Sequence, residues 1–362
     1  MTLFIFELSD KINIPVKSEE ITITEEKGEA LNQKKKATLR DIAQICGCSV
    51  TSVIRAMKDS PTISVALREK VQKTAEELGY INNAVASSMR TGNTNTIAVC
   101  LQDFSNPYYS SIAKYAEKYA REMGYSIIYA TTNELPFVEY KACMKLIEKN
   151  VDGILLLPIQ KDFRAIELLQ KQQMPFVLVG RRFMDHDTDY VVSDDVKAAY
   201  IATKHLIERG ASKILYINAP SYISSSRERL QGYKKALAEH DLESYVMEGS
   251  MEYGQTKKMV KEQLSYFKEF DALFTFCDIM AFETYNALTS LGVRIPSDLK
   301  LISIDGLQED ISLPCNITSI GVNRKEIVKE SFNLLLNKCK GVNTPEPAHI
   351  ILEPYLLQGD TT

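Results

Sequence analysis

The sequence has no tryptophan, only 4 histidines and only 12 prolines among its 362 residues. No stretch approaches the ~18 consecutive apolar residues that indicate a transmembrane helix. The N-terminal "MTLFIFELSDK" has a short apolar run without a basic residue before it, so no secretory signal is indicated. With 45% hydrophobic and 25% charged residues, the composition is typical of a globular protein of two or three domains. We therefore expect a cytoplasmic protein with no membrane partner.

The cysteines argue against disulfides and against a metal site. There are 7 of them, and most lie in apolar runs such as "IAVCLQ" and "ALFTFC", as is typical of reduced cytoplasmic thiols. Only Cys46 and Cys48 are close together, and zinc would need a second pair or nearby histidines, whereas the nearest histidine is His186. We predict no metal, with Cys46 in a helical core and Cys48 in a turn.

Catalytic motifs are also lacking. The sequence has no phosphate-binding glycine loop, no nucleophile elbow and no zinc-type histidine pair. The histidines at positions 186, 205, 240 and 349 are too dispersed to suggest a catalytic cluster. We predict that the chain is not an enzyme and needs no cofactor.

Charge is distributed unevenly along a chain whose formal net charge is -4. Residues 1–33 carry 3 lysines against 7 acidic residues, whereas residues 34–90 carry 10 basic against 5 acidic residues. We interpret residues 1–36, which show no sustained hydrophobic period, as a mobile leader that is either functional or precedes the true start. The basic segment suggests an anionic partner, although on charge alone a solvated charged face explains it equally well.

A helix-turn-helix is predicted after Thr38. Thr38 is a suitable N-cap, and apolar residues follow it at helical spacing as far as Cys46. Gly47 can take the left-handed conformation that turns the chain, and Ser49 can cap a second helix. A third helix ends at Gly79, with an apolar face formed by Leu67, Val71, Ala75 and Leu78. In this arrangement the second helix enters the major groove of DNA. Its outward-facing residues, which can donate to phosphates and base edges, are Thr51, Ser52, Arg55 and Lys58.

Beyond the polar linker in "INNAVASSMRTGNTNT", strand-like and helical stretches alternate. Continuous apolar runs indicate strands buried on both faces, and therefore parallel sheets covered by helices. About eight such strands exceed what one sheet usually holds, so we predict two doubly wound lobes with a ligand cleft at the carboxyl ends of their strands. The runs are "TIAVCLQ", "YSIIYAT", "GILLLPI", "PFVLVG", "YVVSD", "KILYIN", "ALFTFC" and "KLISIDG".

A series of motifs in this order resembles the lactose-repressor family of bacterial transcription regulators, over about residues 37–357. The most specific part is "TLRDIAQICGCSVTSVIRAM", followed by "REKVQKTAEELGY" and "NAVASSM". Further matches are "SNPYY", "VDGILLLP", "HLIERG", "RLQGY", "CDIMA", "GVRIPSDLKLISIDG" and "ITSI".

The resemblance implies an α/β fold with an N-terminal helix-turn-helix head and a two-lobed, periplasmic-binding-protein-like core of doubly wound parallel sheets. The head would span residues 37–82, a hinge helix and linker residues 83–94, and the core residues 95–357. Within the core, lobe 1 would consist of about residues 95–190 and 317–342. Lobe 2 would consist of about residues 191–316 and 346–357.

The resemblance also implies a homodimer that binds a near-palindromic double-stranded operator. Base contacts then fall on Val50, Thr51 and Arg55, while Thr38 and Ser49 cap helices and reach phosphates. Met89 occupies the place of the family's hinge leucine, which wedges into the minor groove; an ordinary apolar linker residue is the alternative. Where the family usually has serine, asparagine and proline, this chain has Ile54, Lys58 and Asn82.

For a small-molecule effector, the resemblance places the main polar contacts on Arg229 and Asp278. Asn106, Tyr108 and Tyr109 begin a helix at the carboxyl edge of the first core strand, and we add them and Asp194 to the predicted effector site. Three positions depart from the family pattern: Gly180, where several relatives have aspartate, Met251, where an aromatic often stacks on the ligand, and Ser193, beside Asp194.

We therefore expect a sequence-specific DNA-binding regulator, a repressor, controlled by a small molecule such as a sugar or related metabolite. A regulator of the same fold controlled by a protein partner is one alternative. A solute-binding protein is another, but it would need an export signal and no head.

Overall fold

The computed structural model describes residues 37–81, 92–183, 185–312, 315–342 and 346–362. The chain divides into two compact units, Met1–Asn83 and Ala84–Thr362, and each is described by itself. The predicted leader, Asn82 at the end of the predicted head, and most of the predicted hinge, including Met89, lie outside the described residues. In the described part of the chain, no helix is long and apolar enough to cross a membrane.

The head consists of three helices, α1 (Leu39–Cys46), α2 (Val50–Met57) and α3 (Val65–Glu77). Thr38 and Asp41 form a capping box at the start of α1, which satisfies backbone amides that have no partner within the helix. One apolar cluster from all three helices forms the core: Ile42, Ala43, Cys46, Val53, Ala56, Val71 and Ala75. The predicted core position of Cys46 is confirmed.

Gly47 forms the turn between α1 and α2, as predicted. Its φ of 68° is left-handed, a conformation that costs glycine little because it has no Cβ. Two residues later, the Ser49 side chain accepts the Ser52 amide at 3.0 Å and starts α2. The prediction for Leu78 was wrong: it follows the last turn of α3 and is 39% exposed, so it lies outside the core of the head.

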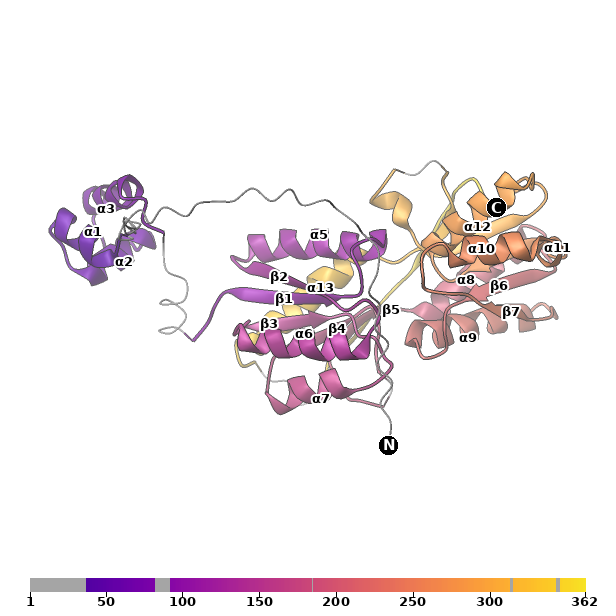
Figure 1. Cartoon of the computed structure of the whole chain (residues 1–362), viewed down its shortest axis with the longest axis horizontal. Coiled ribbons are helices and arrows are strands. Elements are labelled where there is room, and N and C mark those ends of the chain that lie inside the picture. Colours follow the sequence, from indigo (N-terminus) through magenta and orange to yellow (C-terminus); the bar gives the residue numbers. More distant parts are fainter. Residues whose placement is uncertain (1–36, 82–91, 184, 313–314, 343–345) are drawn as a thin grey trace, which may run out of the picture. The chain divides into compact units, whose positions relative to one another are not determined.

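The core unit contains two sheets of six strands each (Figure 1). The first, in lobe 1, has the order β11-β5-β4-β3-β1-β2 and is parallel throughout. Its strands are β1 (Thr96–Leu101), β2 (Ser126–Thr131), β3 (Gly153–Leu156), β4 (Phe176–Val179), β5 (Tyr190–Ser193) and β11 (His349–Leu352).

The second sheet, in lobe 2, has the order β12-β10-β9-β8-β6-β7, and only β12 runs antiparallel to its neighbour. Its strands are β6 (Ile214–Asn218), β7 (Tyr245–Glu248), β8 (Ala272–Thr275), β9 (Lys300–Asp305), β10 (Thr318–Gly321) and β12 (Tyr355–Leu357).

Helices cover both faces of each sheet, which explains the continuous apolar runs of the central strands (Figure 1). In lobe 1, α5 (Pro107–Glu122) and α13 (Arg324–Cys339) pack on one face, and α6 (Pro136–Glu148) and α7 (Arg164–Lys171) on the other. In lobe 2, one face packs against α8 (Asp195–Glu208) and α9 (Ser224–Ala238). The opposite face packs against α10 (Gln255–Glu262), α11 (Leu264–Phe267) and α12 (Asp278–Ser290).

The chain passes between the lobes at positions that differ from the predicted segments. Because β10 pairs with β9, residues 318–321 belong to lobe 2 rather than lobe 1. Because β5 and β11 pair with each other, residues 190–193 and 349–352 both belong to lobe 1. The crossings therefore lie between β5 and α8, between β10 and α13, and between β11 and β12.

Candidate functional site

The head presents a polar face on α2. Thr51, Arg55 and Lys58 are exposed, whereas Val53 and Ala56 of the same helix are buried in the core of the head. Val50 and Ser52 are half-buried, and the Ser52 hydroxyl lies 2.9 Å from the Ser49 hydroxyl. The predicted DNA-contacting residues within the described part of the head, including exposed Thr38 and Ser49, are therefore accessible from solvent at least in part.

A second candidate site is an inner cavity between the lobes, which is open to solvent. The residues around it follow the carboxyl ends of β1, β3, β4, β8 and β9, where ligands bind in open α/β sheets. Its lining includes four residues of the predicted effector site, Asn106, Tyr108, Tyr109 and Arg229. It also includes Gly180 and Met251, two of the positions noted as departures from the family pattern. It also includes Gln102, Arg181 and Asp305, which were not predicted.

The lobe 1 wall of the inner cavity is built on α5 and on the turn after β4. Asn106 caps α5 by accepting the Tyr108 amide at 3.0 Å, which brings both tyrosines to the cavity. Burial raises the pKa of Tyr108 to about 12, so its hydroxyl stays protonated. Arg181 donates to the Tyr109 hydroxyl at 3.3 Å and forms a salt bridge with Glu134 at 2.9 Å. The sequence analysis noted only Gly180 in this turn, whereas the structure shows that the next residue, Arg181, also lines the cavity.

The lobe 2 wall is set by close packing of α9 on α8. A Cβ at Gly232 of α9 would lie 2.0 Å from the Val196 carbonyl oxygen, so only glycine allows the helices to approach this closely. Arg229, one turn earlier, thereby reaches Asp195 of α8, and their Nε and Oδ1 atoms are 2.6 Å apart. Both side chains are buried, and each charge compensates the other.

The prediction for Asp194 does not match the structure. Asp194 is the N-cap of α8 and accepts the Lys197 amide at 2.9 Å, and it lines neither cavity. The neighbouring Asp195 is the residue that faces Arg229. Asp195 therefore holds Arg229 in position, and neither of the two aspartates lines a cavity.

Asp278 is also placed differently from the prediction. Its carboxylate accepts hydrogen bonds from the Ser303 hydroxyl, the Ser319 hydroxyl and the Leu307 amide, and the last two are 2.7 Å long. It is 2% exposed and lines neither cavity. Asp305, at the end of β9, is the carboxylate that faces the inner cavity. Desolvation by burial and the nearby Asp278 raise the pKa of Asp305.

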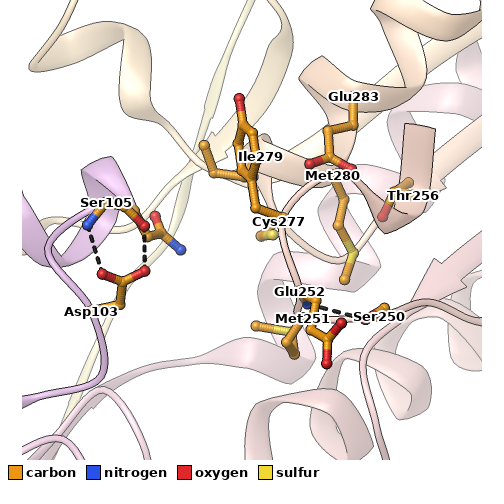
Figure 2. A pocket seen from close by; sticks show the side chains of 12 residues that line it. Asp103, Ser105, Ser250, Met251, Glu252, Thr256, Cys277, Ile279, Met280 and Glu283 are labelled. Carbon is orange, nitrogen blue, oxygen red and sulfur yellow. Dashed lines mark hydrogen bonds between the residues drawn. The ribbon is translucent and has the colours of Figure 1, made fainter. Parts of the chain in front are cut away.

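An outer cavity adjoins the inner one, and Asn106, Met251 and Cys277 line both. Figure 2 shows Asp103 and Ser105 of lobe 1 on one side, facing lobe 2 residues that include Met251, Glu252 and Glu283. Burial raises the pKa of the Cys277 thiol to about 12, so this shared residue offers a neutral thiol.

Direct contacts close the lobes around these cavities. Arg182 of lobe 1 forms a salt bridge with Glu228 of α9 at 2.9 Å, and Gln160 accepts the Ser224 amide at 2.9 Å. The Tyr115 hydroxyl of α5 donates to Asp310 of lobe 2. The structure therefore has the lobes joined by side chains as well as by the three crossings.

Comparison with known proteins matches both units. The family model "Bacterial regulatory proteins, lacI family" matches residues 38–83, and "Periplasmic binding proteins and sugar binding domain of LacI family" matches residues 94–358. The transcriptional repressor PurR of Vibrio vulnificus is 29% identical over 310 residues, which cover 84% of this chain and 92% of PurR. PurR of Vibrio atlanticus is 30% identical over 311 residues, with the same coverage.

Two solved structures have the same fold. The transcriptional regulator CelR in complex with cellobiose is 27% identical with a TM-score of 0.67, covering 90% of this chain and 100% of CelR. The Lac repressor dimer bound to operator and the anti-inducer ONPF has a TM-score of 0.77, covering 90% of this chain and 99% of the repressor. At 21% identity, the second likeness shows the fold alone.

The predicted family and fold are thus confirmed, and the relatives are transcriptional regulators. With a helix-turn-helix head and a periplasmic-binding-protein-like core, the chain belongs to the LacI family of DNA-binding, effector-controlled bacterial regulators.

Proposed function

We propose that the chain is a homodimeric repressor that binds a near-palindromic operator and releases or holds it according to a small molecule bound between the lobes. Such a regulator acts in the cytoplasm and is not an enzyme. The observation that carries the proposal is the exposed face of α2, where Thr51 and Arg55 point away from the core after the left-handed turn at Gly47. A helix presented in this way fits the major groove.

In this proposal the residues of the head divide into two roles. Val50, Thr51 and Arg55 read base edges, and the other contacts go to phosphates, from Thr38, Ser49, Ser52 and Lys58. Arg55 makes no ion pair in the part of the chain that the structure describes, so its guanidinium is available for a bidentate contact to guanine. Met89, outside the described residues, would wedge into the minor groove.

The effector site in this proposal is the inner cavity, with Asn106, Tyr108, Tyr109 and Arg229 among its contacts. Its position between two lobes supports control of DNA binding, because a ligand that contacts both lobes favours the closed arrangement. The likeness to CelR, solved with cellobiose, supports a ligand of sugar size.

The proposal is tested by selecting bound duplexes from a random library and then measuring the affinity of Arg55→Ala for the selected sequence. We expect the variant to lose about 1 to 3 kcal/mol of specific binding if Arg55 contacts a base bidentately. Lys73→Ala, which removes an exposed basic residue of α3, is the matched control and should change affinity little. If Arg55→Ala weakened random duplexes as much as the selected one, Arg55 would be a phosphate contact instead.

A further inference from the structure

Among the described residues, the two cavities between the lobes are lined by more carboxylates than guanidinium groups, and nearby Arg229 and Arg324 offset only part of the charge of Asp305. Four carboxylates line them, those of Asp103, Glu252, Glu283 and Asp305. No lysine, arginine or histidine forms a salt bridge with any of these four carboxylates in the described parts of the chain. The cavities therefore have an excess of negative charge that a ligand could compensate.

The positive charges that line the cavities are already neutralised within the protein. Arg181 pairs with Glu134 at 2.9 Å and Arg229 pairs with Asp195 at 2.6 Å. Arg181 also donates to the Pro158 carbonyl, and Arg229 donates to the Phe276 carbonyl. An anionic ligand would have to compete with these buried carboxylates for the guanidinium groups, at a considerable cost in free energy.

The inner cavity also contains an acceptor without a donor. The Gln102 amide nitrogen donates to the Leu157 carbonyl at 3.0 Å, which fixes the orientation of the amide group. Its Oε1 atom is buried and has no hydrogen-bond partner, although Gln102 is only 2% exposed and lines the cavity. A buried acceptor without a partner is costly, so this atom indicates a ligand that brings a donor.

Asp305 adds a second acceptor in the inner cavity. It is 5% exposed, and desolvation by burial is the largest cause of its raised pKa. A positively charged group in the cavity would favour the ionised carboxylate and offset part of this desolvation.

The outer cavity has further features that suit a cation. The Tyr253 side chain is 84% exposed and lines the cavity, so its ring face is available to an ammonium group. Hydrogen bonds from Ser105 lower the pKa of Asp103, which is therefore ionised at neutral pH. No lysine or arginine is among the described residues that line this outer cavity (Figure 2). A cleft lined by carboxylates concentrates a negative electrostatic potential, which attracts cations.

We propose that the effector carries a protonated amine together with hydroxyl groups, and that the amine is bound by Asp305 and Gln102. This inference rests on the proposed function, because it takes the cavities between the lobes as the effector site. The hydroxyl groups of such a ligand would bond the neutral polar groups of the walls, among them Tyr108 and Asn106. An amino sugar or another amino alcohol has this chemistry, whereas a sugar phosphate or a carboxylic acid does not.

The experiment compares matched ligands on the unmodified full-length chain by isothermal titration calorimetry. The first set is glucosamine, glucose and glucose 6-phosphate, which share one ring and differ in charge. A wider panel of amino alcohols, neutral polyols and organic anions follows, screened by thermal shift. We expect amines to bind at least about tenfold more tightly than their neutral analogues, because the amine adds a charge-assisted hydrogen bond that a neutral hydroxyl cannot make. We expect the anions not to bind.

The best amine ligand is then measured against Asp305→Asn. This substitution keeps the shape of the side chain and removes its charge, so we expect the amine affinity to fall about ten- to a hundredfold. Its neutral analogue should lose much less. Asp241→Asn, at an exposed position away from both cavities, is the matched control and should leave the affinity unchanged. The ligand comparison does not depend on whether the Asp305 variant folds.

The outcomes separate this inference from the proposed function. Tighter binding of an anion or of a neutral polyol than of its amine analogue overturns the inference and leaves small-molecule control intact. If no compound of any class binds while the selected duplex still does, small-molecule control fails together with the inference. An amine that binds equally well to Asp305→Asn and to the native chain removes Asp305 from the site.

Discussion

Glu139 is a buried carboxylate whose charge should make the stability of the core depend on pH. It lies on α6, is 2% exposed and accepts the Ile159 amide at 2.9 Å. Burial raises its pKa to about 7, whereas a glutamate in the unfolded chain has a pKa of about 4.3. The folded state therefore holds a proton that the unfolded state releases, and stability is lost as pH rises between these two values.

Glu139→Gln should remove the loss of stability at high pH, because glutamine still accepts the Ile159 amide and cannot ionise. Relative to the native chain, we expect the variant to gain up to about 3 kcal/mol of unfolding free energy at pH 8 and almost nothing at pH 4. Urea denaturation at both pH values measures the difference. Glu148→Gln, exposed on the same helix, should show no such pH dependence. A gain of the same size at pH 4 and pH 8 would mean that packing, not ionisation, is responsible.

At the scale of elements, Asp278 joins the start of α12 to the ends of two strands. Its carboxylate holds Ser303 of β9, Ser319 of β10 and the Leu307 amide that follows β9. Burial raises the pKa of Asp278, and these three hydrogen bonds oppose that shift because they stabilise the ionised carboxylate. A carboxylate in the first turn also interacts favourably with the helix dipole.

Asp278→Asn should therefore destabilise lobe 2, because the amide nitrogen of asparagine would face donors. We expect a loss of about 2–3 kcal/mol, as for hydrogen bonds to charged groups, measured by thermal denaturation. Asp241→Asn, which removes an exposed carboxylate, should change the melting temperature much less. If Asp278→Asn instead kept its native melting temperature and failed only to bind the effector, Asp278 would be a direct contact as the family pattern suggests.

The elements that the sequence predicts are those with strong local signals. The caps at Thr38 and Ser49, the glycine at position 47 and the eight long apolar runs all have their expected roles. Four strands were missed, β7, β10, β11 and β12, and three of them, β7, β11 and β12, alternate between more and less exposed residues instead of forming a continuous apolar run. Their places depend on pairing between segments far apart in the sequence, which no local pattern reports.

The cavity between the lobes was predictable as a region and less so as individual residues. The tyrosines and Arg229 line the inner cavity, and each lies next to a clear helix or strand boundary. The carboxylates were misplaced, because Asp194 and Asp195 are adjacent in the sequence and only the helix cap decides which one turns inward. Nothing in the sequence distinguishes Asp278 from Asp305 as the group that faces the cavity.

At the scale of the whole core, the salt bridge between Arg182 and Glu228 joins the two lobes. Both side chains are largely buried, so the pair should be stronger than an exposed one, at about 1–2 kcal/mol. Glu228→Ala should shift the unliganded chain toward a more open arrangement. Small-angle X-ray scattering should then show a larger radius of gyration, and an effector should bind more weakly.

Glu208→Ala provides the control for this prediction. Its partner is Lys204 on the same helix, so the loss of that pair leaves the contacts between the lobes unchanged. Identical scattering from Glu228→Ala, Glu208→Ala and the native chain would show that the three crossings alone keep the lobes closed.

The last strand of each sheet comes from the C-terminal end of the chain, and this affects the order in which the domains can fold during synthesis. The sheet of lobe 1 is completed only by β11 (His349–Leu352), and that of lobe 2 only by β12 (Tyr355–Leu357). The three helices of the head, in contrast, close their own apolar cluster within residues 39–80. Since domains fold as units during translation, the ribosome exposes a folded DNA-reading module well before either half of the sensor can form. A transcript truncated late in the gene would therefore yield a head that still folds, attached to a core unable to respond.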